Sequence, residues 1–270
     1  MKGVKRHSKE DRRRVVAEMI PLIKRKFGDN LIGLAYDGSM GRDEDTDYSD
    51  VELIAYLRET PDNKSLHAMV KIVDGMLIEF EWVTVDEQIK KVREVTADWY
   101  IAGSDFQKAI INEELIDRIN KHEVADLERR CRDWAAAGWP EIQEMTCKLL
   151  NAIDQRNTDG IPLLFFELCL QMIQILAYIN ARPYTTFSRF VTQARQLPIK
   201  PAGFNKLLDI LTDGSYSDHA ALRKVTEQVF TEFEVIFEDL GYDLYYNDFD
   251  PNLPHKDYFE AVIKEKHKSR

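Results

Sequence analysis

Apolar side chains recur every three or four positions between residues 15 and 27, and Gly28 follows the last of them. Ser8 stands before this stretch, with acidic side chains at positions 10 and 11, as is typical of a helix N-cap and first turn. The pattern predicts an amphipathic helix that begins after Ser8 and ends at Gly28.

Three strands are predicted next. Residues 31–36 form an uninterrupted apolar run that ends at Gly38, and residues 51–57 form a second one. Residues 76–83 alternate between apolar and polar side chains, after a turn at Asp74 and Gly75. A short helix is expected near residues 65–70, and another from Thr84 or Asp86 to residue 95.

Beyond residue 106 the pattern is helical throughout. Helices are predicted at residues 110–119, 124–134, 140–153, 161–179, 186–196, 204–211 and 219–240. Pro140 suits the first turn of its helix, where no backbone N–H bond is needed. The 161–179 segment is the most apolar, but three polar side chains interrupt it, so we expect a buried core helix and not a membrane span.

The change of pattern predicts an α+β chain in two halves. We place a mixed sheet flanked by helices at residues 1–120, a helical-bundle domain at 121–242, and a C-terminal extension at 243–270.

Composition and charge narrow the class of function. Of the 270 residues 44% are hydrophobic, which is enough for a packed core. The 37 basic and 47 acidic side chains leave a net charge of −10, which argues against a nucleic-acid partner. The same charge favours a small cationic co-substrate. Three scattered cysteines, and basic N-terminal residues without a following apolar stretch, indicate reduced, buried thiols in a cytoplasmic protein.

Two carboxylates lie at the start of the second strand. Asp50 and Glu52 are two residues apart, so both side chains project from one face. Like charges repel and each carboxylate loses hydration there, which a hard divalent cation would offset. Gly38 and Ser39 follow the first strand and can offer backbone N–H groups and a hydroxyl to phosphate oxygens. The sequence therefore predicts a Mg²⁺ and nucleoside triphosphate site.

These residues also resemble a known family. A Gly-Ser turn, then Arg42, then the acidic strand at Asp50 and Glu52 is similar to the signature of the nucleotidyltransferase superfamily. Within it, the version here resembles the kanamycin nucleotidyltransferases, which are aminoglycoside 4'-O-nucleotidyltransferases. The resemblance implies a nucleotidyltransferase-type sheet domain and a Mg²⁺-dependent transfer of AMP from ATP to a hydroxyl of an aminoglycoside-type antibiotic.

The resemblance also assigns roles to individual residues. Glu79 and Glu81 share one face of the third strand, and the resemblance favours Glu79 as a third acid beside Asp50 and Glu52. Glu144 and Lys148 are four residues apart, which alone indicates an ordinary surface ion pair. The implied roles are Mg²⁺ ligation by Asp50, Glu52 and Glu79, nucleotide binding by Gly38, Ser39, Arg42 and Lys148, and general base catalysis by Glu144.

Two alternatives and one expectation about assembly accompany this hypothesis. The same chemistry could act on a lincosamide or a protein hydroxyl, or the chain could be a catalytically silent nucleotide-binding module. The family resembled here works as a symmetric dimer with shared active sites. We therefore expect a homodimer in which Asp50 of one chain faces Glu144 of the other. No membrane partner is expected.

Overall fold

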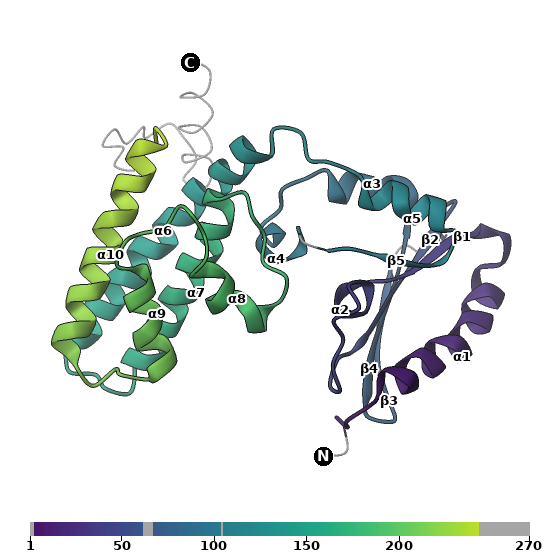
Figure 1. Ribbon diagram of the computed structural model, residues 1–270, viewed down its shortest axis with the longest axis horizontal. Helices are drawn as coiled ribbons and strands as arrows, with labels where there is room; N and C mark the ends of the chain where they lie inside the picture. Colours follow the sequence, from purple (N-terminus) through teal and green to yellow (C-terminus); the bar gives the residue numbers. More distant parts are fainter. Residues whose placement is uncertain (1–2, 62–66, 104, 243–270) are drawn as a thin grey trace. The chain divides into compact units, whose positions relative to one another are not determined.

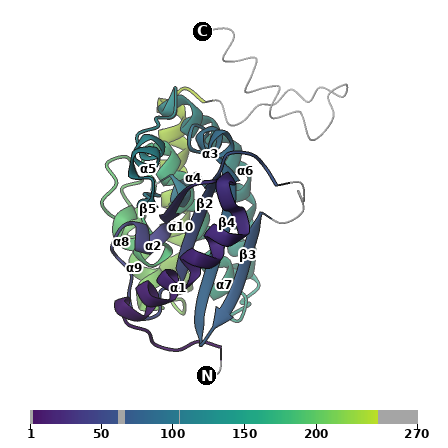
Figure 2. The same cartoon turned by 90° about the vertical axis from the view of Figure 1, so that its right-hand side faces the viewer.

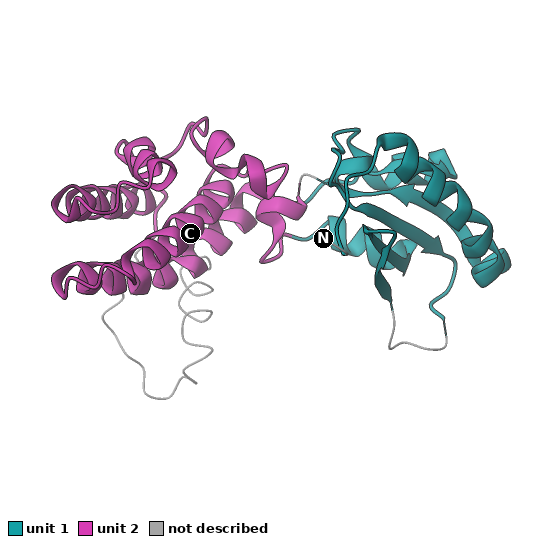
Figure 3. Ribbon diagram, turned by 90° about the horizontal axis from the view of Figure 1, so that it is seen from below, with its two compact units in different colours: residues 1–94, 105–125 teal, residues 95–104, 126–270 magenta. Residues whose placement is uncertain are grey.

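The computed structural model describes residues 3–61, 67–103 and 105–242 (Figure 1). The chain divides into two compact units, one of residues 1–94 and 105–125 and one of residues 95–104 with the chain from Asp126 onward (Figure 3). The sequence placed a single boundary between residues 120 and 121. The extension at 243–270 lies outside the described residues.

The first unit is a sheet with helices. Its helices are α1 (Lys9–Phe27), α2 (Gly38–Gly41), α3 (Val85–Val92) and α5 (Glu113–Asn120), with a 3-10 turn at Gly28–Asn30. Its strands are β1 (Leu31–Tyr36), β2 (Val51–Leu57), β3 (Ala68–Val73), β4 (Met76–Thr84) and β5 (Lys108–Ile111). Within the described residues they form one sheet in the order β3-β4-β2-β1-β5, in which β2 and β4 are parallel and the other pairs antiparallel. The predicted mixed sheet is confirmed.

Local chemistry fixes the beginning of this unit as the sequence predicted. Ser8 caps α1 and exchanges hydrogen bonds with Asp11, so two backbone donors at the helix start are satisfied. Gly28 ends the helix with a φ of 53°, which a residue without a Cβ adopts at little cost. The predicted bounds of β1 and β2 are confirmed residue for residue.

Each face of the sheet is covered by a helix. Val16 and Ile23 of α1 pack on Leu53 and Phe80 on one face, and Figure 2 shows α1 lying across the strands. On the opposite face Ile116 of α5 packs with its neighbours against Tyr56 and Ile54. Because side chains alternate along a strand, Glu52 points to the same face as Ile54 and Tyr56.

The short helix predicted near residues 65–70 is wrong at residues 68–70, which belong to strand β3 (68–73), while residues 65 and 66 lie outside the described residues. The backbone of β3 pairs with β4, as in the pair Met69 and Phe80. Asp74 and Gly75 join the two strands with φ angles of 50° and 82°, the left-handed pair of a two-residue hairpin turn. Tertiary pairing thus overrides a weak helical pattern, whereas the predicted turn is confirmed.

The helix predicted at residues 110–119 is confirmed from Glu113 onward as α5, but its predicted start is wrong, because residues 108–111 form strand β5. β5 adds to the sheet beside β1, and Asn112 then takes a φ of 65°. Its side chain accepts a hydrogen bond from the Leu115 amide and caps α5. One residue in a left-handed conformation therefore converts a strand into a helix inside one apolar run.

The second unit is helical. It contains α4 (Trp99–Ala102), α6 (Leu127–Asp154), α7 (Ile161–Ile179), α8 (Phe190–Ala194), α9 (Phe204–Asp213) and α10 (His219–Asp239), with a 3-10 turn at Phe187–Arg189. Helix α7 is long and apolar enough to span a bilayer, yet Phe165, Leu168 and Leu176 are fully buried in the unit. The prediction of a core helix is confirmed.

Two predictions about the helical half are wrong in detail. Residues 124–134 and 140–153 were predicted as separate helices, but α6 continues through Pro140. A proline inside a helix removes one backbone hydrogen bond. Trp139 stacks on Phe230 of α10 with ring centroids 4.8 Å apart, and such burial holds the helix on both sides of the proline. Cys147 is exposed on α6, whereas Cys131 and Cys169 are buried as expected.

Candidate active site

The strand register brings two of the predicted acids together. Glu52 of β2 pairs in parallel register with Glu79 of β4, so their side chains project side by side from one face. Glu81 lies one pleat further along, beside Ile54. Asp50 precedes β2 and raises the pKa values of both Glu52 and Glu79 by its charge. This arrangement supports Glu79 and not Glu81 as the third acid.

The carboxyl group of Glu52 is electrostatically the most perturbed of these acids. Burial, followed by the charges of Asp50, Asp37 and Glu79, raises its pKa to about 7. Burial, with the charges of Asp50 and Glu81, also raises the pKa of Glu79. Crowded carboxylates of this kind are the oxygen donors that a hard divalent cation prefers, and such an ion would offset their repulsion.

The turn at Gly38 and Ser39 lies directly against Glu52. Gly38 has a φ of +52°, and a Cβ there would stand 1.6 Å from Oε2 of Glu52, so only glycine fits. The Ser39 backbone amide lies near the Glu52 carboxylate and lowers its pKa, against the burial that raises it. Ser39 Oγ is buried and finds no hydrogen-bond partner among the described residues. An orphaned hydroxyl beside an amide suits a phosphate oxygen.

Arg42 follows the turn and already has acidic partners. Its Nε lies 3.3 Å from Oε2 of Glu44, and its Nη1 lies 3.6 Å from Oδ1 of Asp105. The Nη1 atom is buried and makes no hydrogen bond within the described parts of the chain. A phosphate that bound Arg42 would therefore compete with carboxylates for the guanidinium.

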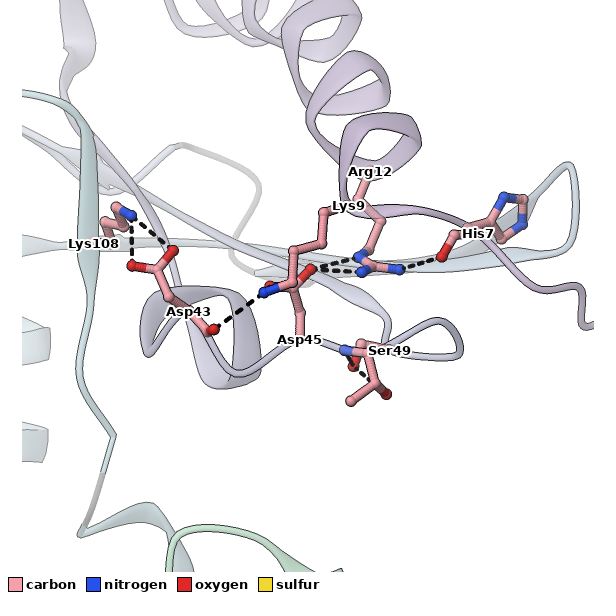
Figure 4. A network of polar contacts seen from close by, with 8 residues as sticks. His7, Lys9, Arg12, Asp43, Asp45, Ser49 and Lys108 are labelled. Atoms are coloured by element: carbon pink, nitrogen blue, oxygen red, sulfur yellow. Dashed lines mark hydrogen bonds and ion pairs between the residues drawn. The ribbon is translucent and has the colours of Figure 1, made fainter.

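A buried ion pair holds the acidic loop that leads from α2 to Asp50 (Figure 4). Arg12 of α1 is fully buried and donates from Nε and Nη2 to Asp45 Oδ2 at 2.9 and 2.6 Å. Lys9 Nζ lies 3.2 Å from Asp45 Oδ1, and Arg12 also donates to the carbonyl of His7. Although burial alone raises the pKa of Asp45, these bonds lower it below its usual value. The loop is thereby anchored to α1.

The remaining predicted residues lie on α6 in the second unit. Lys148 Nζ is 2.7 Å from Glu144 Oε1, and the two side chains are 53% and 59% exposed. Within its own unit this is the surface i,i+4 pair that sequence spacing alone indicates. Thus the structure brings Asp50, Glu52, Glu79, Gly38 and Ser39 together, while Glu144 and Lys148 form a separate pair.

The acids fit a divalent cation by chemistry more than by their present positions. Among the described residues no group of three or more His, Cys, Asp or Glu side chains has its ligating atoms gathered for a metal ion. Glu52 and Glu79 are nevertheless register partners on adjacent strands, so the two side chains start from neighbouring backbone positions on one face.

Comparison with known proteins shows what the chain as a whole is similar to. Residues 135–243 match the family described as KNTase C-terminal domain. The chain is 21% identical over 248 residues to an aminoglycoside nucleotidyltransferase (4') from Staphylococcus aureus, covering 87% of this chain and 93% of the relative. A protein of the same name from Bacillus sp gives the same values.

The predicted resemblance is confirmed. The chain is a distant relative of the aminoglycoside nucleotidyltransferases, and α7 to α10 lie within the matched KNTase C-terminal domain. A solved nucleotidyltransferase-like protein from Exiguobacterium sibiricum 255-15 matches with a TM-score of 0.46 and 11% identity, covering 83% of this chain and 75% of that one.

Sequence reasoning missed one acid of this site. Asp37 stands between β1 and Gly38, and its charge raises the pKa of Glu52 more than the charge of Glu79 does. The available signal was its place directly before the Gly-Ser turn. Its side-chain partner Gln107 lies 70 residues away in sequence, and only the fold brings the two together.

The raised pKa of Glu52 predicts how stability depends on pH without divalent cations. A folded-state pKa above the unfolded value of 4.5 means that the folded protein binds the extra proton, so stability falls as pH rises from about 4.5 to about 7. The loss should be on the order of 2 kcal/mol after allowance for solvent screening. Thermal melts in EDTA should show it in the wild type. Glu52→Gln should flatten the profile, and an unchanged profile in this variant would refute the assignment.

Proposed function

We propose that the chain is a Mg²⁺-dependent nucleotidyltransferase that moves AMP from ATP to a hydroxyl of a small acceptor. The observation that carries the proposal is the pairing of Glu52 with Glu79 in register, directly against the turn at Gly38 and Ser39. Groups that can donate hydrogen bonds to phosphate and acids that can bind a cation are thus gathered on interior strands of one sheet. The relationship to aminoglycoside nucleotidyltransferases supports the same chemistry.

The sheet unit would bind the nucleotide. Asp50 and Glu52, with Glu79, would hold Mg²⁺, which neutralises charge on the triphosphate. Ser39 would offer its hydroxyl and amide to the β- and γ-phosphates, and Arg42 would exchange Glu44 and Asp105 for the phosphates. These groups would orient the triphosphate so that the acceptor hydroxyl can attack the α-phosphorus in line with the leaving pyrophosphate.

The helical unit would supply the proton acceptor. Glu144 takes the proton of the acceptor hydroxyl while its oxygen bonds to the α-phosphorus. The bond from the α-phosphorus to the bridging oxygen breaks, and pyrophosphate leaves with both electrons. Lys148, 2.7 Å from Glu144, offsets negative charge on the departing group.

The acceptor we propose is an aminoglycoside-type antibiotic. Two relatives carry aminoglycosides in their names, and a cationic acceptor suits a chain of net charge −10. The test is pyrophosphate release from ATP and Mg²⁺ with aminoglycosides, with lincosamides and without acceptor. Pyrophosphate release with an aminoglycoside supports the proposal. Release with lincosamides alone would show that the acceptor is a lincosamide and not an aminoglycoside. No release with any acceptor would refute the proposed nucleotidyltransferase activity.

Glu144→Gln tests the proposed base. We expect turnover to fall roughly a hundredfold while nucleotide affinity is unchanged, because a base acts on the acceptor and not on ATP. Stability should change by less than about 0.5 kcal/mol, since the pair with Lys148 is exposed. Glu141→Gln, an exposed glutamate on the same helix, is the control. A loss of nucleotide binding in Glu144→Gln would show that this residue is structural.

We also propose a cytoplasmic homodimer with shared active sites, in which Asp50 of one subunit acts with Glu144 of the partner subunit. A homodimer can share sites in this way because two-fold symmetry repeats each contact. Nucleic acids and membranes are not proposed as partners.

A further inference from the structure

A buried chain of hydrogen bonds lies behind the Gly38 turn. Tyr56 is fully buried and its hydroxyl donates to Gln107 Oε1. Gln107 is 4% exposed, and its Nε2 donates to Asp37 Oδ2 at 3.4 Å. Two buried side chains, Tyr56 of β2 and Gln107 just before β5, are thus connected to the half-buried Asp37 that follows β1.

Gln107, the middle member of this series of hydrogen bonds, is held firmly by its backbone. The Gln107 backbone amide donates to Asn120 Oδ1 at 3.1 Å, and Asn120 Nδ2 donates to the Gln107 carbonyl at 2.8 Å. Both main-chain groups of Gln107 are therefore fixed by the last residue of α5. The Gln107 side chain therefore reaches Asp37 from a backbone position that α5 holds in place.

Asp37 in turn connects the elements of the proposed nucleotide site. Its Oδ1 accepts from the Gly38 amide at 2.9 Å, and its own amide donates to the Glu52 carbonyl at 3.0 Å. The same residue therefore joins the turn to β2. Its carboxylate also lies near enough to Glu52 to raise the pKa of that group.

The direction of the hydrogen bonds from Tyr56 through Gln107 requires an acceptor at Asp37. Burial raises the pKa of Tyr56 above its usual value, so its hydroxyl keeps its proton and donates. An amide that accepts on its oxygen presents its NH₂ group on the other side. Gln107 therefore points a donor at Asp37, and an ionised carboxylate is the strongest acceptor for it.

We propose that Asp37 is a positioning residue of the cation and phosphate site, held by the Tyr56 and Gln107 chain. It fixes the Gly38 and Ser39 amides against β2 and adds a negative charge beside Glu52. This inference rests on the proposed function, since it concerns the cation that Asp50 and Glu52 would bind. It predicts that Tyr56, which is buried and is not a proposed cation ligand, affects the affinity for that cation.

The experiment measures Mn²⁺ affinity of the whole chain by electron paramagnetic resonance, without nucleotide, together with thermal melts. Asp37→Asn should bind Mn²⁺ roughly tenfold more weakly, because one nearby charge is lost while the asparagine oxygen still accepts from Gly38. Tyr56→Phe should weaken Mn²⁺ binding roughly threefold, because Gln107 loses the bond that orients it. Tyr184→Phe removes another buried tyrosine hydroxyl, which donates to the Ile173 carbonyl, and is the matched control.

The outcomes separate this inference from the function on which it rests. If Tyr56→Phe and Tyr184→Phe both lower the melting temperature but only the former weakens Mn²⁺ binding, the positioning role is supported. If Asp37→Asn binds Mn²⁺ as the wild type does while Asp50→Asn does not, the inference is refuted and the cation site stands. If Asp50→Asn also binds normally, the proposed cation site itself fails. Asp37→Asn decides the matter alone should Tyr56→Phe fail to fold.

Discussion

Asp50→Ala and Glu52→Ala are each expected to lower nucleotidyl transfer by at least about a thousandfold, because each removes an oxygen donor of the proposed cation. Neither change should unfold the protein. In the absence of a cation, burial and then the charge of Asp50 raise the pKa of Glu52, so the ionised Glu52 carboxylate is unfavourable where it lies. We therefore expect melting temperatures in EDTA to stay equal or rise.

The control for this prediction lies on the neighbouring strand. Glu81→Ala removes a carboxylate from the face of β4 that also carries Glu79. Glu81, however, pairs with Ile54 and not with Glu52. Its activity should stay within a fewfold of wild type. Near-wild-type turnover by Asp50→Ala or Glu52→Ala in Mg²⁺ would end the metal-site interpretation, and equal losses in all three variants would indicate a general electrostatic effect.

Restoration of activity from two dead variants is the second large effect. If Asp50 of one subunit acts with Glu144 of its partner, mixed dimers of Asp50→Ala and Glu144→Ala hold one site with both lesions and one with neither. Random exchange of subunits should then restore about a quarter of wild-type sites by symmetry. The measurement is pyrophosphate release before and after the two proteins are mixed under exchanging conditions.

A second mixture makes this result specific. Asp50→Ala mixed with Glu52→Ala should recover no activity, because both lesions lie at the start of β2. Each site would take its sheet residues from one subunit, so every site in this mixture would carry one of the two lesions. Absence of recovery with Glu144→Ala, or a monomer by light scattering, contradicts the shared site.

Local signals in the sequence predicted the first helix and the first two strands well. The Ser8 cap, the Gly28 stop and the uninterrupted apolar runs fixed α1, β1 and β2, because each boundary there is set by neighbours in sequence. The preference for Glu79 over Glu81 came from the family resemblance, because the alternation of the strand puts both on one face and only the strand register pairs Glu79 with Glu52.

The errors arose where distant contacts decide local structure. β3 and β5 are strands because β4 and β1 pair with them, and α6 passes through Pro140 because Trp139 packs on α10. Asp37 escaped notice for the same reason. Its partner Gln107 lies 70 residues away in sequence and is brought to it only by the addition of β5 to the sheet.

The accessible thiol of Cys147 gives the chain a ready point of attachment. It stands between Glu144 and Lys148 on α6, while the other two cysteines are buried. A maleimide fluorophore should therefore label the wild-type protein at one position, next to the proposed base, without mutagenesis. Energy transfer from that dye to a fluorescent ATP analogue would report the separation of α6 from the bound nucleotide during turnover.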